Sequence, residues 1–201
     1  MAERPWGLAA LALLLAGAAA AQEAGIALRP EDRARLGALD ASVGQGLRQA
    51  LATGDAGQVD DAVTALRGAP LAADRVEVAA LVGDWSCRMI RIGGMLPAVS
   101  YPPFRCRIGT GAAPEFEKLT GSQRTRGHLH RDGGRWIYLG SSFVAGESPR
   151  PYADFPAGMD TAATETLPDV AVFELLGPDR ARLIFPAPYR ESLVNVLTLS
   201  R

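Results

Sequence analysis

The hydrophobic residues of this chain change their spacing at Gly83, and this change constrains the fold more than any other feature. Beyond Gly83, apolar and polar residues alternate in residues 85–90 and again in 104–108. Alternation is the two-residue period of β-strands with one buried face. Before Gly83, apolar residues recur at three- and four-residue steps, which is the period of amphipathic helices. The sequence therefore predicts an α+β protein with a helical part followed by a β-rich part.

Six more strand candidates follow the first two, and short turns separate them. They are residues 115–120, 125–130, 135–144, 169–176, 180–185 and 193–199. Asp132-Gly133-Gly134 and Gly177-Pro178-Asp179 are strong turn signals between neighbouring candidates. About eight short strands with tight connections are typical of an antiparallel barrel or sandwich, and we expect the barrel. Residues 145–168, rich in Pro, Ala, Gly and Thr, form a long loop that is either a lid or a connector without a role.

The helical part begins at Pro30, where a first helical turn tolerates proline, and Glu31 and Asp32 favour its amino end. One apolar face is built from Leu36, Leu39, Val43, Leu47 and Leu51. Gly54-Asp55 interrupts this pattern, and a second helix is expected over residues 59–66. These two segments predict a helical hairpin. Residues 72–81 suit either a third helix or a strand.

Residues 1–21 have the pattern of a cleavable secretory signal peptide. Arg4 supplies positive charge, residues 8–16 are an apolar run, and Ala19-Ala20-Ala21 is a small-residue cleavage site. The run is shorter than the roughly 20 apolar residues that span a bilayer. We therefore expect a periplasmic or secreted protein without a transmembrane segment in its mature chain. Its expected parts are a signal peptide (1–21), a helical segment (22–82) and an antiparallel barrel (83–201).

Cys87 and Cys106 are the only cysteines, an even count in a chain expected to reach an oxidising compartment. If residues 85–90 and 104–108 pair antiparallel with Cys87 opposite Cys106, both thiols point toward the core. We therefore predict a structural disulfide, which is worth about 3 kcal/mol in the chain-entropy model. Two ligands do not complete a tetrahedral metal site, so a metal role is disfavoured.

Three segments carry a resemblance to a known family. Residues 83–88 (GDWSCR), 101–107 (YPPFRCR) and 117–124 (EKLTGSQR), together with Glu191-Ser192, are similar to the uncharacterised proteobacterial family called domain of unknown function 4893. This resemblance covers roughly residues 28–199 and implies a Gram-negative periplasmic setting, but no activity and no catalytic residue. The Gly83-x-Trp85 pattern also resembles lipocalin-like barrels, at the level of the fold alone.

The charge of the chain is unevenly distributed, although its formal net value is only -1. This balance argues against nucleic acid as a partner. Residues 86–150 contain ten basic and four acidic residues, whereas residues 22–85 contain six basic and ten acidic ones. Lys118 is the only lysine, which we interpret as genomic composition bias.

Outward-facing arginines in the β-rich part form a candidate anion-binding face. They are Arg88, Arg105, Arg107, Arg124 and Arg126, with Arg88 and Arg105 expected across from each other. Arginine forks suit carboxylates and phosphates. In one interpretation the acidic helical part docks on this face and neutralises it. In the other, the face binds an anionic envelope component or an acidic protein.

Catalytic patterns are weak in this chain. Ser122 lacks the glycines of a nucleophile elbow. His128 and His130 share one strand face and are weak metal candidates that need a third ligand, such as Asp132 or Glu117. We therefore expect a non-catalytic binding or interaction protein of the cell envelope, without a cofactor. The alternatives are a lipocalin-like carrier of a small ligand and a metal-dependent protein or hydrolase that uses the two histidines.

Overall fold

The computed structural model describes residues 27–201, so the expected signal peptide lies outside the described part of the chain. The helices are α1 (Pro30–Gly37), α2 (Leu39–Thr53), α3 (Ala56–Leu66) and the short α4 (Val78–Leu81), with 3-10 turns η1 (Ala73–Arg75) and η2 (Tyr152–Asp154). None of these helices has the length and hydropathy of a membrane-spanning segment. The strands are β1 (Gly83–Ile92), β2 (Ala98–Ser100), β3 (Phe104–Ile108), β4 (Glu115–Lys118), β5 (Gln123–Asp132), β6 (Arg135–Val144), β7 (Leu167–Gly177), β8 (Arg180–Pro186) and β9 (Val194–Ser200).

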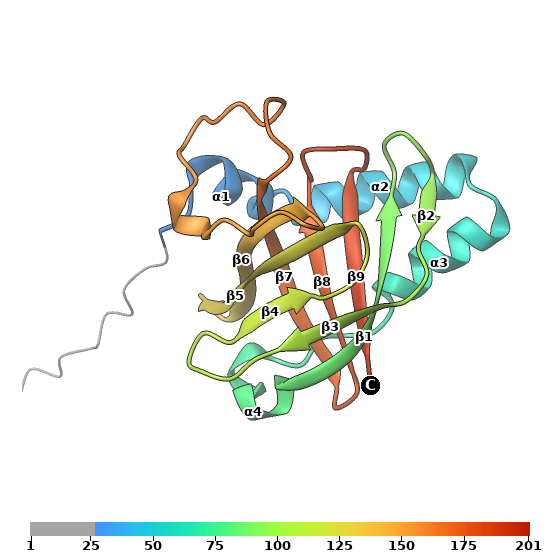
Figure 1. Ribbon diagram of the computed structural model, residues 1–201. Coiled ribbons are helices and arrows are strands. Elements are labelled where there is room, and N and C mark those ends of the chain that lie inside the picture. Colours follow the sequence, from blue (N-terminus) through green and yellow to red (C-terminus); the bar gives the residue numbers. More distant parts are fainter. Residues whose placement is uncertain (1–26) are drawn as a thin grey trace, which may run out of the picture.

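Strands β1 and β3 to β9 form a closed antiparallel barrel (Figure 1). Neighbours in the sequence are neighbours in the sheet, and β9 closes the barrel by pairing with β1 in the register Ile90↔Val196. The short β2 lies beside the far end of β1, outside this ring. The predicted antiparallel barrel of about eight strands is confirmed, as is the mixed α+β class.

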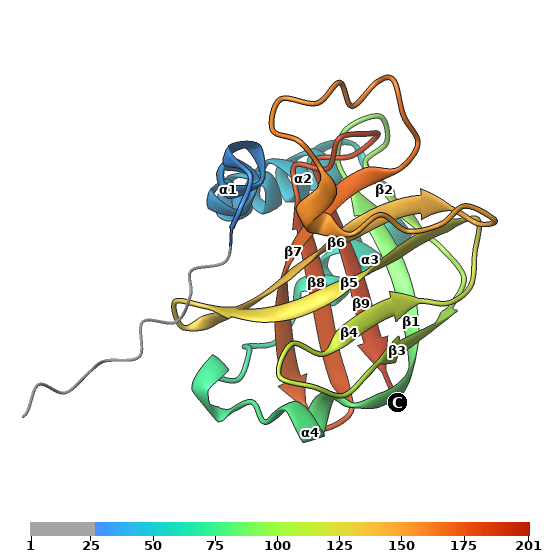
Figure 2. The ribbon, with the colours of Figure 1, turned by 60° about the vertical axis from the view of Figure 1, so that its left-hand side comes forward.

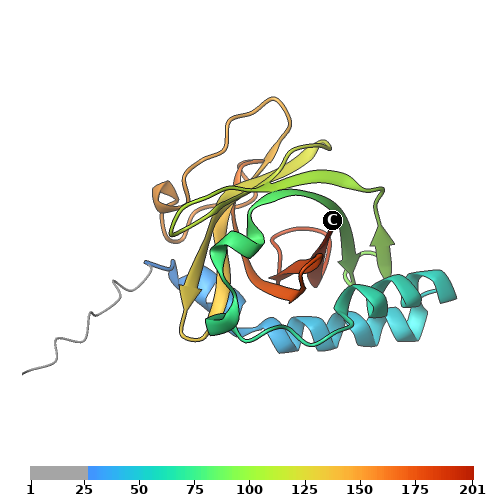
Figure 3. The same ribbon diagram turned by 90° about the horizontal axis from the view of Figure 1, so that it is seen from below.

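The helices cover one side of the barrel wall from outside (Figure 3). Outward-facing residues of β1, β8 and β9, such as Ile92, Ile184 and Val196, pack on Ala50 of α2 and Ala62 of α3. A second contact places Leu36 of α1 against β6 and β7. A third cluster fills the barrel interior. Strands under the helices are therefore buried on both faces. In the rest of the wall, inward-facing residues are buried and outward-facing residues are more exposed.

The helical part differs from the expected two-helix hairpin. Ala38 adopts a non-helical C-cap conformation after α1, and a new helix begins at Leu39. The expected break at Gly54-Asp55 is present, because Asp55 caps α3 by accepting a hydrogen bond from the Gln58 backbone at 2.9 Å. Residues 72–81 contain only η1 and α4. Three helices thus precede the barrel, with a short fourth one at its base.

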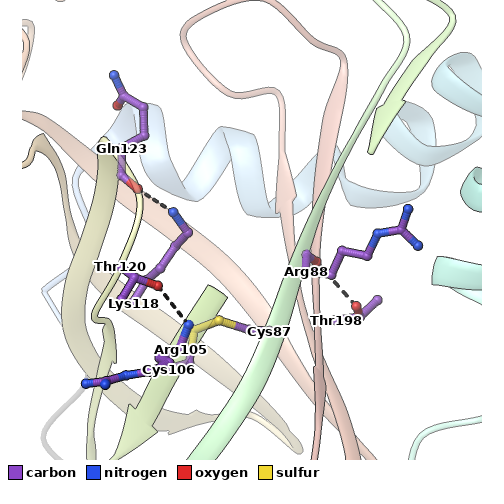
Figure 4. Close-up of a disulfide and its surroundings, with 8 residues drawn as sticks. All are labelled: Cys87, Arg88, Arg105, Cys106, Lys118, Thr120, Gln123 and Thr198. Carbon is purple, nitrogen blue, oxygen red and sulfur yellow. Dashed lines mark hydrogen bonds between the residues drawn. A yellow bond between two sulfur atoms is a disulfide. The ribbon is translucent and has the colours of Figure 1, made fainter. Parts of the chain in front are cut away.

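The expected register of β1 and β3 is wrong by two residues. Trp85 pairs with Cys106, and Cys87 pairs with Phe104, so the cysteines are diagonal rather than opposite. Both still point inward, and their Sγ atoms lie 1.95 Å apart, at disulfide distance (Figure 4). The same shift separates Arg88 from Arg105, which pairs with Ser86. Alternation fixes the face of a residue but cannot distinguish registers that differ by two.

The two ends of the barrel differ. At one end, α4 lies beside the opening (Figure 3), where Trp85 donates a hydrogen bond from its indole nitrogen to the Leu81 carbonyl at 2.9 Å. Both side chains are buried in the cluster that fills the barrel interior. The loops 145–166 and 187–193 lie at the other end (Figure 2). We call that end the barrel mouth.

Candidate functional site

A cavity of about 240 Å³ lies at the barrel mouth. The ends of β1, β4, β6 and β8 and the beginnings of β3, β5, β7 and β9 contribute to it, together with the loop 187–193. Its apolar lining includes Met89, Phe104, Leu167 and Phe185. Its charged lining consists of Arg35, Arg91, Lys118, Arg124, Arg190, Glu165, Asp169 and Glu191. An apolar wall with a few charged groups is the usual composition of a small-molecule site.

Lys118 is the least exposed cation of this cavity, at 4%. It ends β4 on the inner face of the barrel, directly opposite Cys106. Its Nζ donates a hydrogen bond to the Gln123 carbonyl (Figure 4) and lies 3.7 Å from the centre of the Phe104 ring. Burial, followed by the nearby charges of Arg124 and Arg91, lowers the pKa of Lys118 to about 8.

The turn between β4 and β5 is shaped around this lysine. Gly121 has φ +92°, a backbone conformation that L side chains rarely adopt. A Cβ atom at this position would lie 2.8 Å from Lys118 Nζ and from the Phe104 ring. Glycine is therefore required both for the turn and for the space that the lysine and the ring occupy.

Cations outnumber their carboxylate partners around the cavity. Arg91 pairs with Glu191, and Arg190 pairs with Glu165 at 2.9 Å. Among residues 27–201, no carboxylate lies within ion-pair distance of Lys118, whose pKa is affected by neighbouring cations and by no acid. Arg124 donates to the Gly121 carbonyl at 3.0 Å. The Lys118 side of the cavity therefore carries positive charge that residues 27–201 leave uncompensated.

Asp169 lines the same cavity and connects it to the barrel core. The Thr125 hydroxyl donates to the Asp169 carboxylate at 2.7 Å and lies 2.7 Å from the hydroxyl of the fully buried Tyr138. Burial raises the pKa of Asp169 to about 6, although Arg35 and Thr125 oppose this effect. The carboxyl group is thus held in an environment that favours its neutral form.

A buried charge cluster beside the cavity fixes the two loops of the mouth to α1. The Asp32 carboxylate is fully buried and pairs with Arg29 at 3.1 Å and Arg35 at 3.0 Å. Tyr152, in the loop 145–166, donates its hydroxyl to Asp32 at 2.8 Å. Arg35 also donates to the Ala187 carbonyl at 3.1 Å and stacks on Tyr189, in the loop 187–193. The long loop that the sequence offers as a lid is therefore tied to the helical part.

The five arginines of the predicted anion-binding face occupy different surroundings. Arg88 contacts Asp61 of α3 at 3.3 Å, which is the contact expected if the acidic helices neutralise the face. Arg107 pairs with Asp84 at 2.6 Å, and Arg126 forms a bidentate pair with Glu115. Arg105 is exposed on β3. Only Arg124 lines the barrel-mouth cavity.

The two histidines lie outside the barrel, in an outer groove between β5 and residues 149–153. Their ring centres are 6.3 Å apart, and burial, followed by the proximity of His128, lowers the pKa of His130. No group of three metal-ligating side chains exists in residues 27–201. The third ligands that the sequence suggests are elsewhere, since Asp132 contacts Arg135 and Glu117 pairs with Arg126 in the sheet register.

Ser122 lines the barrel-mouth cavity, whereas the histidines line the outer groove. The arrangement thus does not join a serine nucleophile to a histidine base. The residues that sequence reasoning missed are Lys118, Asp169 and the aromatic wall. One signal was present: Lys118 shares inward parity with Phe116, so a charge stands on a core-facing position.

The fold and the cavity define the class: an α+β protein whose closed antiparallel barrel holds a charged cavity at one end. The chain belongs to the family described as Domain of unknown function (DUF4893), whose model matches residues 25–199. This match confirms the resemblance carried by the segments 83–88, 101–107 and 117–124. No curated protein and no solved structure matches the chain. The function is therefore argued from the residues themselves.

Proposed function

We propose that this protein is an exported, non-catalytic binding protein of the cell envelope, which holds a small ligand in its barrel-mouth cavity. The ligand has an apolar body and an anionic group. The observation that carries this proposal is the buried Lys118, which faces the cavity with Arg91 and Arg124 near it and no acid of its own. Uncompensated buried cations are costly, and an anionic ligand offsets that cost.

The apolar lining supports the rest of the ligand description. Phe104 and Phe185 offer rings to an apolar body, while Met89 and Leu167 add flexible aliphatic surface. The volume of about 240 Å³ suits a compact molecule rather than a long lipid chain. The proposed protein is thus a lipocalin-like carrier of a small ligand. Its barrel, residues 83–201, follows the helical segment 22–82 in the sequence.

Export is part of the same proposal. Residues 1–21 have the signal-peptide pattern, and the Cys87–Cys106 pair suits an oxidising compartment such as the periplasm. An anionic ligand in that compartment reaches the cavity through the barrel mouth.

Calorimetric titration tests the proposal with octanoate, octyl phosphate and octyltrimethylammonium, which share an apolar chain and differ in charge. We expect the two anions to bind and the cation not to bind. Lys118→Met and Arg124→Met each lose about tenfold or more in octanoate affinity, since a charge-assisted hydrogen bond contributes about 1.5–3 kcal/mol. Arg48→Met, on the exposed face of α2, is the matched control and keeps the affinity. Equal binding of anion and cation, or unchanged binding in both cavity variants, would refute the proposal.

A further inference from the structure

Lys118 is the only lysine among 21 lysine and arginine residues, and it is the least exposed of the basic residues that line the cavity. All other residues of this set are arginines. A lysine differs from arginine in one respect that matters here: its amine can lose a proton near neutral pH, whereas a guanidinium does not. Lys118 therefore lies at a position where a neutral amine has access to a ligand in the cavity.

The surroundings of Nζ favour such an amine. Burial and two neighbouring cations disfavour the charged form, and a pKa of about 8 leaves a substantial neutral fraction at pH 7–8. The Gln123 carbonyl still accepts a hydrogen bond from a neutral amine and holds it in place. The lone pair of nitrogen is then free, and no carboxylate among residues 27–201 re-protonates it through an ion pair. This is how lysines that react with carbonyl groups are activated.

We propose that Lys118 forms an imine with the carbonyl carbon of an oxo acid, a ligand that carries both an aldehyde or ketone and an anionic group. This inference rests on the proposed function, because Arg91 and Arg124 bind the anionic group while the carbonyl group reaches Nζ. The neutral amine attacks the carbonyl carbon and gives a carbinolamine. The carbinolamine hydroxyl leaves with the nitrogen proton as one water molecule, and a C=N bond replaces C=O. The reaction is reversible and needs no oxidant or reductant.

Reductive trapping tests the imine. The purified protein is incubated at pH 8 with 4-oxobutanoate and sodium cyanoborohydride, and intact mass with peptide mapping locates the adduct. We expect one adduct on Lys118. The control is the double variant Lys118→Arg with Arg48→Lys, which moves the single lysine to the exposed face of α2. An ordinary lysine, with a pKa of about 10.4, is under 1% neutral at pH 8, so the relocated lysine reacts at least about tenfold more slowly.

The outcome that overturns this inference is an adduct on Lys118 that forms no faster than on the relocated lysine, or an adduct confined to the terminal amine. Butanal, a neutral aldehyde, separates this failure from that of the proposed function. If octanoate binds but 4-oxobutanoate leaves Lys118 unlabelled, only the imine is refuted. If octanoate does not bind and butanal labels Lys118 as fast as 4-oxobutanoate, anion recognition is refuted and oxo-acid selectivity with it.

Discussion

Cys106 and Lys118 lie directly opposite each other across β3 and β4, and both side chains point into the barrel. The link from Cys106 to Cys87 on β1 thus holds together the part of the wall that carries the cavity lysine. The disulfide therefore couples the stability of the barrel to the candidate site. If β3 loosens, β4 loses its pairing partner, and β4 carries Lys118.

Replacing Cys87 and Cys106 by alanine should lower the free energy of unfolding by about 3 kcal/mol, since the disulfide closes a loop over a sequence separation of 19 residues. Urea unfolding of the wild-type protein and of the double variant, each with and without dithiothreitol, measures this. The reductant should destabilise the wild-type protein and leave the variant unchanged. A difference below about 1 kcal/mol would show that the pair does not constrain the unfolded chain.

The barrel was predictable because its signals are local, as with the alternation in β1 and β3 and the Gly133-Gly134 turn between β5 and β6. The exact register was not, because the parity of Cys87 and Cys106 allows both an opposite and a diagonal pairing. The cavity was not predictable either. Its residues come from the ends of strands far apart in the sequence, so no short spacing brings Lys118 and Asp169 together before the barrel closes.

The individual charge pairs were not predictable for a related reason. A sum over residues 86–150 gives a basic region, but ion pairs form between particular neighbours on adjacent strands, as between Arg107 and Asp84 or Arg126 and Glu115. The sum therefore does not show these pairs, and the anion-binding face of the five arginines stays a prediction. The buried Asp32 cluster was equally hidden, because its partner Tyr152 is 120 residues away in the sequence.

Alanine at Gly127 should destabilise the barrel severely. Gly127 pairs with Gly140, and a Cβ at position 127 would lie 2.2 Å from the Leu139 carbonyl oxygen, a backbone atom that cannot move alone. We expect Gly127→Ala to cost at least about 3 kcal/mol or to prevent folding. Gly177→Ala, at the end of β7 with no atom within 4 Å of the added Cβ, is the control and should change little. Equal urea midpoints for the two variants would contradict this account.

Asp32→Asn should be among the most damaging polar substitutions, at about 3–5 kcal/mol, because it leaves Arg35 buried without its counter-charge and Arg29 with Glu31 alone, at 3.8 Å. Tyr152→Phe removes one hydrogen bond to the same carboxylate and should cost only about 1 kcal/mol. Limited proteolysis provides a second measurement, since both variants weaken the attachment of the loop 145–166 to residues 29–32 and should make the loop easier to cleave. A stable Asp32→Asn variant with an uncleaved loop would mean that the cluster does not anchor the mouth.

Asp169 should give the protein a stability that falls as the pH rises from about 4 to about 6. Its pKa is about 6 in the folded protein and about 3.9 when unfolded, so the folded state binds the additional proton in this window. Ionisation is then penalised only in the folded state, at a cost on the order of 3 kcal/mol that is fully present about one pH unit above the folded-state pKa. Asp169→Asn keeps an oxygen for the Thr125 hydroxyl and removes the titration. Subtracting urea-derived stabilities of the variant from those of the wild-type protein at each pH isolates this group. If this difference in the free energy of unfolding does not change between pH 4 and 6, Asp169 ionises in the folded protein at no cost.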